Sequence, residues 1–170
     1  MNRSLIRIIF TFALLLPLQV LVFRNFVVFG TGFSFIYLLC LLMLPVEMSV
    51  ITGMIVALFT GLAVDLFYHT LGIHAAASVF LMFLRYHWLR MNGPRSGYEV
   101  NHLPLLSNYG LGWFIGYALP LIFVHSLVVF FVEAGNVALF WQSTFRALIT
   151  TIISLIFIVI SQYFLYPREQ

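Results

Sequence analysis

Long apolar runs constrain the fold of this chain more than any single motif does. A helix needs roughly 20 mostly apolar residues to cross a hydrocarbon core about 30 Å thick. Because 63% of the 170 residues are hydrophobic and only 8% are charged, the chain cannot hide this surface in a water-soluble core. The sequence therefore predicts a single integral membrane domain over residues 1–170, with helices near 5–23, 33–47, 50–69, 73–91, 109–133 and 139–166.

The runs indicate helices and not strands. They are rich in Leu, Ile, Phe and Val and do not alternate between apolar and polar positions, as the strands of a membrane barrel would. The connection from Asn92 to Ser107 contains two glycines, two prolines and many polar side chains, which is typical of a solvent-facing loop. We expect an all-α, polytopic bundle of about six transmembrane helices.

Arginine distribution predicts the orientation in the membrane. If both termini are cytoplasmic, six of the eight arginines lie inside and two, Arg24 and Arg146, lie outside. This bias favours cytoplasmic N- and C-termini. The basic and aromatic side chains near 85–95 are expected to anchor the inner face, and the sequence pI of about 9.3 favours contact with anionic lipid, so no nucleic-acid partner is needed. The expected anchor residues are Arg85, Trp88, Arg90 and Arg95.

The residue inventory excludes several chemistries. All eight basic residues are arginine, so the chain has neither a phosphate-loop lysine nor a Schiff-base lysine. Cys40 is the single cysteine, which excludes an internal disulfide and a cysteine metal cluster. Asp65 is the single aspartate, so no paired-aspartate protease site can form. We therefore expect a protein that is not an enzyme and has neither a cofactor nor a metal site.

Asp65 lies on a narrow stripe of one predicted helix. Residues four apart share a helix face, and the stripe consists of Gly53, Ala57, Gly61, Asp65 and His69. Small residues at this spacing allow close helix packing in lipid, and Gly112 and Gly116 predict a second close approach. Because a carboxylate facing lipid is costly, Asp65 is expected to face the bundle or to lie near the outer headgroups.

Two interpretations of Asp65 remain open. One is an ion or substrate site, the usual role of an intramembrane carboxylate. The other is a hydrogen-bonded polar clamp with His69 and His74 at the turn into the next helix. The clamp is favoured because the other carboxylates fall at helix ends or in loops. Other polar residues of the helices, such as Gln19, His125 and Ser143, are expected to pack between helices.

Several ordered motifs resemble one family. The central ones are Gly61-x-x-x-Asp65, the run Thr70-Leu71-Gly72-x-His74-Ala75-Ala76-Ala77-Ser78, and Leu84-Arg85. Further matches are Gln19, Arg24-Asn25, Phe29-Gly30-x-Gly32, Phe35-Ile36-Tyr37 to Leu44-Pro45, Gly97-Tyr98-Glu99, Trp113, His125 and Arg146. Together they resemble the MreD family of rod-shape-determining proteins, in its bacteroidete-type branch. Many members have Pro-Asp where this chain has Gly32-Phe33-Ser34.

The resemblance implies a function in the bacterial inner membrane. It implies a non-enzymatic subunit of the cell-elongation machinery, a partner of an MreC-like single-span protein and, indirectly, of MreB filaments and the wall-synthesising glycosyltransferase and transpeptidase. The family's helical arrangement is similar to that of the substrate-binding subunits of energy-coupling-factor vitamin transporters, which are the alternative. The bulky residues between Ile8 and Phe23 favour the scaffold, because a transporter subunit is expected to have small residues there for docking.

Overall fold

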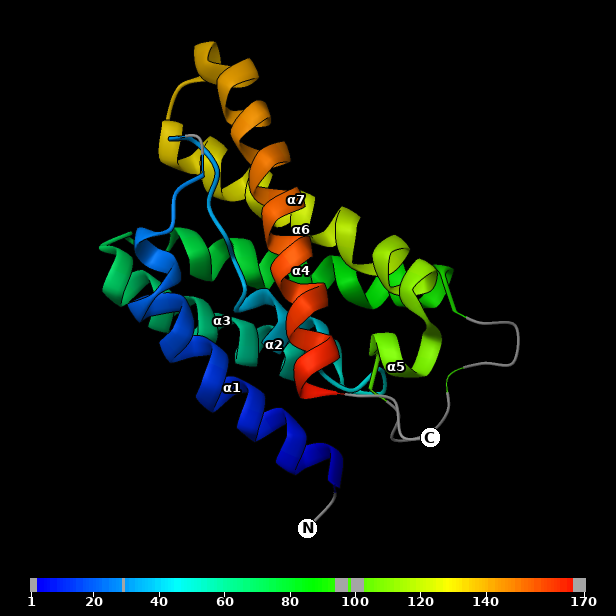
Figure 1. Cartoon of the computed structure of the whole chain (residues 1–170). Coiled ribbons are helices and arrows are strands. Elements are labelled where there is room, and N and C mark those ends of the chain that lie inside the picture. Colours follow the sequence, from blue (N-terminus) through cyan, green and yellow to red (C-terminus); the bar gives the residue numbers. More distant parts are fainter. Residues whose placement is uncertain (1–2, 29, 94–97, 99–102, 167–170) are drawn as a thin grey trace.

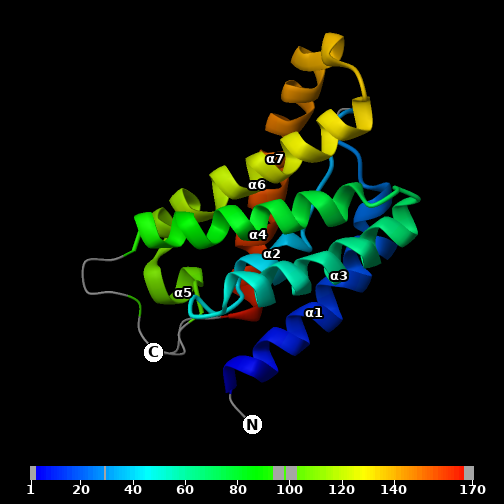
Figure 2. The same cartoon turned by 180° about the vertical axis from the view of Figure 1, so that it is seen from behind.

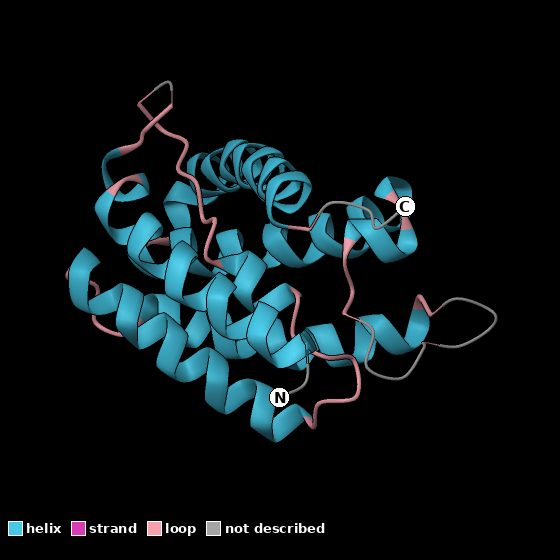
Figure 3. Cartoon of the chain, turned by 60° about the horizontal axis from the view of Figure 1, so that its bottom comes forward, coloured by secondary structure: helices cyan, strands magenta, loops and turns pink. Residues whose placement is uncertain are grey.

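The chain folds as a bundle of helices (Figure 1, Figure 3). The structure is a computed structural model that describes residues 3–28, 30–93, 98 and 103–166. Within them there is no sheet, only an isolated bridge between Val28 and Gly32. The helices are α1 (Arg3–Leu21), η1 (Phe23–Asn25), α2 (Leu38–Leu42), α3 (Val50–Tyr68), α4 (Ile73–Met91), α5 (Leu106–Tyr109), α6 (Leu111–Ala134), η2 (Val137–Leu139) and α7 (Phe140–Leu165).

Four segments are long and apolar enough to cross a membrane: Ser4–Asn25, Val50–Tyr68, Leu111–Ala134 and Phe140–Leu165. This is the pattern of a multi-pass membrane protein. The α4 helix has 19 residues, as many as α3, but it contains Arg85, His87 and Arg90 and is less apolar. Of these three residues, Arg85 is buried, whereas His87 and Arg90 are exposed.

The prediction of a spanning helix over 33–47 is wrong. Only the five residues of α2 are helical there, and the chain on both sides of α2 is irregular. Fifteen residues of α-helix would be about 22 Å long at a rise of about 1.5 Å per residue, which is shorter than a hydrocarbon core of about 30 Å. Chain that is partly extended covers more distance per residue. The segment therefore passes through the bundle with its side chains buried from Phe35 to Leu44.

Side chains of the surrounding helices hydrogen-bond the backbone of this segment. In α7, Thr150 Oγ1 accepts from the Phe33 amide at 3.1 Å and Ser154 Oγ accepts from the Phe35 amide at 2.8 Å. Gln19 of α1 donates to the Ser34 carbonyl oxygen at 2.9 Å and accepts from the Tyr37 amide at 3.3 Å. Irregular backbone at membrane depth requires such partners because lipid offers none. Gln19, which was expected to pack between helices, thus supports the segment together with Thr150 and Ser154.

The segment's other end is held by α4 and α6. Tyr117 donates its hydroxyl proton to the Leu42 carbonyl oxygen at 2.7 Å. The guanidinium of Arg85 donates to the same oxygen and to the Leu44 carbonyl oxygen. These contacts join α2 to the second half of α4 and the first half of α6. The irregular segment is therefore attached to the bundle at both ends.

The α3 and α4 helices form a close hairpin, seen from behind in Figure 2. A Cβ atom added at Gly61 would lie 2.6 Å from the Ala75 amide nitrogen and 2.7 Å from the His74 carbonyl oxygen. One added at Gly53 would lie 2.7 Å from the end of the flexible Met82 side chain. Ala57, between them, is fully buried. The stripe of small residues on α3 thus lies against α4, with its tightest point at Gly61.

The corresponding expectation for α6 needs correction. Gly112 and Gly116 are exposed, and a Cβ atom added at either would meet no atom within 4 Å. The buried face of α6 instead carries Phe114, Tyr117 and Ala118. Glycine spacing alone therefore does not distinguish a packed stripe from one that points away from the bundle.

The first helix and the last helix meet at one end of the bundle. The Tyr166 hydroxyl, just after α7, donates to the Arg7 carbonyl oxygen in the second turn of α1 at 3.3 Å. At the same end, Gln162 of α7 accepts from the Leu106 amide of α5 at 2.7 Å. The connections between α3 and α4 and between α6 and α7 lie at the opposite end (Figure 1).

Gly61→Ala should destabilise the protein. The added methyl group must push α4 away from α3, and overpacking of this kind typically costs about 1–3 kcal/mol. Gly116→Ala is the matched control, since it is also a glycine within a helix but has open space around it. Thermal unfolding of the detergent-purified variants measures both. Equal melting midpoints for the two variants would contradict the close approach.

Thr150→Val should also destabilise the protein. The isosteric valine removes the acceptor of the Phe33 amide, and an unsatisfied buried group costs about 1–3 kcal/mol. Thr151→Val is the control, because Thr151 is equally buried but its hydroxyl donates only to the Ala147 carbonyl oxygen of its own helix. If both variants have the same melting midpoint, the hydrogen bond from the Phe33 amide to Thr150 contributes little to stability.

Candidate functional site

Asp65 lies at the connection between α3 and α4. The α3 helix ends at Tyr68, and His69 follows in a left-handed conformation with φ of 57°. Gly72, with φ of 82°, then begins α4 without a side chain that could cap it. The first amides of a helix have no partner within it, so those of α4 need an acceptor from elsewhere.

The carboxylate of Asp65 supplies that acceptor. Its Oδ1 accepts from the His74 amide at 3.0 Å and from the Thr70 hydroxyl, and its Oδ2 accepts from the Ala75 amide at 2.9 Å. These amides belong to the second and third residues of α4, the positions that a capping side chain normally satisfies. A negative charge is also favoured at the positive end of a helix dipole. Asp65 therefore clamps α3 to the start of α4.

The clamp differs from the predicted one in its partners. The side chain of His69 is exposed, and no hydrogen bond or ion pair in the described part of the chain joins it to Asp65. The reason is the left-handed turn at His69, which ends the helical register that would place the two on one face. His74 contributes its backbone amide to the clamp, while its side chain points elsewhere.

A polar cluster lies beneath the clamp in the core. The Tyr37 hydroxyl is 2.8 Å from Nε2 of His125, 3.3 Å from Nδ1 of His74 and 3.3 Å from Oγ of Ser78. All four residues are buried, and the ring of Phe35 packs edge-on against both imidazoles. A phenol has one proton to donate, so Tyr37 bonds one imidazole as donor and can accept from the serine hydroxyl. The cluster joins the irregular segment to α4 and α6.

A small cavity of about 140 Å³ opens beside this cluster. Its lining includes His74, Thr70 and Glu133 among apolar and aromatic side chains. Glu133 at its rim forms an ion pair with Arg146 at 3.5 Å, and the Arg146 guanidinium lies over the ring of Phe130. Such a cavity suits water or a small polar molecule, because sites for drug-sized ligands occupy about 300–1,000 Å³.

Arg85 is not the inner-face anchor that the sequence suggested. It is only 3% exposed, and its Nε donates to the Tyr117 hydroxyl at 2.7 Å while Nη2 donates to the Leu42 and Leu44 carbonyl oxygens. The correction follows from packing, since α2 and α6 cover the face of α4 on which Arg85 lies. Leu81 and Leu89, one turn before and one turn after Arg85, are buried with it.

The other expected anchor residues differ in their exposure. Trp88 is partly buried and its indole donates to the Gly116 carbonyl oxygen at 3.3 Å. Arg90 is exposed, lies over the ring of Tyr86 and donates to the Tyr86 hydroxyl at 3.1 Å. Arg95 lies outside the described residues.

Sequence reasoning missed Tyr37 and Ser78 as partners of the histidines. One signal was available for Ser78, because it follows His74 by four residues and shares its helix face. No such signal existed for Tyr37, whose position depends on the irregular path of the segment. Arg85 also carried a signal, since leucines at four-residue spacing on both sides mark its helix face as buried.

Several of the residues that carry the resemblance to the MreD family lie together at the α3–α4 connection. Gly61 allows the approach of Ala75, Asp65 caps the amides of His74 and Ala75, and Gly72 supplies the turn. Comparison with protein-family models, curated proteins and solved structures found no match to this chain. The resemblance stays a prediction that these residues carry.

Asp65→Leu should strongly destabilise the protein and Asp65→Asn should do so less. Leucine leaves both α4 amides without an acceptor, at about 1–3 kcal/mol for each unsatisfied group. Asparagine keeps one oxygen as an acceptor, but its NH₂ group faces an α4 amide that is itself a donor. Melting midpoints of the purified variants test this order, with Glu133→Gln as a control because it changes only a partly exposed ion pair. If Asp65→Asn melts like the wild type yet loses function as fully as leucine does, the charge itself is required and the clamp is an incomplete account.

Proposed function

We propose that this chain is a non-enzymatic scaffold subunit of the bacterial cell-elongation complex, similar to MreD. In this proposal it binds an MreC-like single-span protein within the inner membrane. That partner in turn couples MreB filaments to the wall-synthesising glycosyltransferase and transpeptidase. Cell shape then depends on an interface and not on a reaction catalysed by this chain.

The observation that carries the proposal is the engagement of Asp65. The one aspartate of the chain accepts hydrogen bonds from three donors of the α3–α4 connection, so both of its carboxylate oxygens are already engaged within the protein. The residues of the clamp also belong to the central motifs that carry the family resemblance. A structural role for them supports a protein that works by presenting helix surfaces.

The exposed faces of the helices suit such a role. Large apolar side chains point outward on several helices, among them Leu66 of α3, Leu119 of α6 and Ile152 of α7. In a membrane these faces meet lipid or another helix, and packing drives helix association there. A single-span partner requires one such face.

The cavity beside His74 gives the vitamin-transporter alternative little support, and the larger cavity of about 330 Å³ at the other end of the α3–α4 hairpin is lined by two arginines. A substrate-binding subunit needs a cavity that encloses its ligand, and the cavity beside His74 has a volume of about 140 Å³. That volume is below the range of about 300–1,000 Å³ that small-molecule sites occupy.

We also propose that both termini face the cytoplasm, as the arginine distribution favours.

Site-specific photocrosslinking in native membranes tests the scaffold. A photoreactive residue placed at Leu66, Leu119 or Ile152 samples three different helix faces with minimal change to the core. We expect one face to capture a single-span protein, and the other two positions serve as matched controls. Depletion of the chain should round the cells.

Two outcomes would overturn this function. One is capture of no single-span protein from any face while depletion leaves cell shape unchanged. The other is a vitamin that stabilises the purified protein together with co-purification of an energy-coupling scaffold. A ligand at about 100 times its dissociation constant adds roughly 2.7 kcal/mol of stability, which a melting experiment detects readily.

A further inference from the structure

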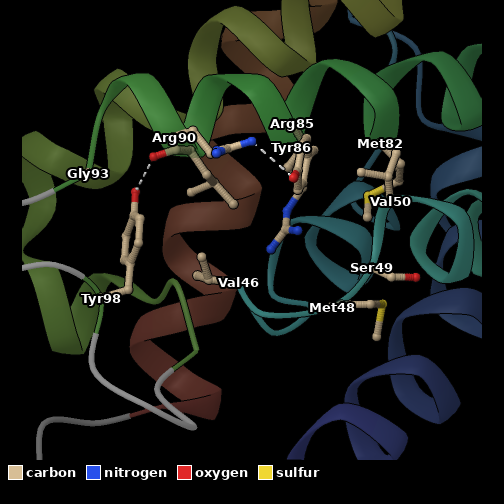
Figure 4. A pocket seen from close by; sticks show the side chains of 11 residues that line it. Val46, Met48, Ser49, Val50, Met82, Arg85, Tyr86, Arg90, Gly93 and Tyr98 are labelled. Atoms are coloured by element: carbon tan, nitrogen blue, oxygen red, sulfur yellow. Dashed lines mark hydrogen bonds between the residues drawn. The ribbon is translucent and has the colours of Figure 1, made fainter.

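A larger cavity lies at the opposite end of the α3–α4 hairpin from Asp65. It has a volume of about 330 Å³ and is bordered by the start of α3, the second half of α4 and the connection that leads from α2 into α3 (Figure 4). Gly93 and Tyr98, which follow the end of α4, also line it (Figure 4). None of the clamp residues lines this cavity, so it is separate from the site described above.

The cavity contains a buried charge, Arg85, that forms no ion pair with a carboxylate of the described residues. The Arg85 side chain points from α4 toward the connection that carries Val46, as Figure 4 shows. Its hydrogen-bond acceptors, the Tyr117 hydroxyl and the Leu42 and Leu44 carbonyl oxygens, are all neutral. Its Nη1 group makes no hydrogen bond with a described residue. Because a buried charge is costly unless it is paired, an anion in the cavity would be favoured beside Arg85.

Other groups around the cavity add positive potential. Arg90 lines it and, like Arg85, forms no ion pair with any carboxylate in the described ranges. Ser49 and Val50 place the start of the 19-residue helix α3 at its wall, where the helix dipole favours negative charge. No acidic side chain is among the described residues that line the cavity.

Tyr98 does not offset this charge. Its hydroxyl donates to the Leu89 carbonyl oxygen at 2.9 Å. Burial raises the pKa of Tyr98 to about 12, so the phenol remains protonated and neutral at physiological pH. The cavity therefore presents two arginines and a helix N-terminus to whatever enters it.

We propose that this cavity binds a phosphate group, the chemistry shared by a phospholipid headgroup and a free phosphate. Guanidinium groups bind phosphate in a paired, charge-assisted geometry, and a helix N-terminus contributes to the same site. Val46, Val50 and Met82 give the lining an apolar side that a glycerol or acyl group of a lipid can contact. The volume leaves room for a headgroup beyond the phosphate itself.

Lipid binding to the purified full chain tests the proposal. Native mass spectrometry in detergent compares dioleoyl phosphatidylglycerol with zwitterionic dioleoyl phosphatidylcholine, and a parallel arm adds inorganic phosphate as a competitor. We expect phosphatidylglycerol to bind in preference, and Arg90→Gln to weaken that binding by about tenfold, since a charge-assisted hydrogen bond is lost. Competition by millimolar inorganic phosphate assigns the site to free phosphate, and its absence assigns the site to the lipid; both support a phosphate site.

Arg24→Gln is the matched control, since Arg24 is an exposed arginine in η1, away from the cavity. Arg85→Gln adds a second variant that keeps donors for the carbonyl oxygens but removes the charge, and it should abolish the preference. Arg90→Gln keeps the test decisive if that variant fails to fold. Equal binding of the two lipids, or equal weakening by Arg24→Gln and Arg90→Gln, would overturn the proposal.

Discussion

The hydrogen-bonding requirement of backbone in lipid governs this structure. Residues 33–37 and the chain that follows α2 lie within the bundle outside regular helix, and a membrane interior offers no water to hydrogen-bond their backbone. Thr150, Ser154 and Gln19 support one end of the segment, and Tyr117 and Arg85 support the other. The positions of α1, α4, α6 and α7 around the segment follow from this requirement, and so does the burial of their polar residues.

Much of the fold was predictable from the sequence, because hydropathy reports which segments leave water. The predicted boundaries for 50–69 and 73–91 differ from those of α3 and α4 by a residue at most. The run 33–47 misled the prediction because hydropathy does not distinguish a helix from irregular chain that other helices cover. The decisive partners lie 117 and 119 residues away along the chain, at Thr150 and Ser154, where no local pattern connects them.

The candidate site was predictable in position but not in detail. Four-residue spacing placed Asp65 on the face of Gly61, and the structure puts both against α4. The identity of its partners depended on backbone conformation at His69 and Gly72, which spacing does not encode. Arg85 was placed wrongly, because its charge suggested the inner surface of the membrane, whereas the leucines one turn away on each side indicated the core.

The α3–α4 pair holds opposite charges at its two ends, and backbone dipoles meet both of them. Amides of α4 surround the carboxylate of Asp65, while carbonyl oxygens of the α2 segment meet the guanidinium of Arg85. The two ends differ in whether polar groups remain available to a further partner. Both carboxylate oxygens of Asp65 are engaged, so that end is committed to structure. The Arg85 end keeps a donor group and a cavity beside it, and the balance of charge there favours an anion from outside the chain.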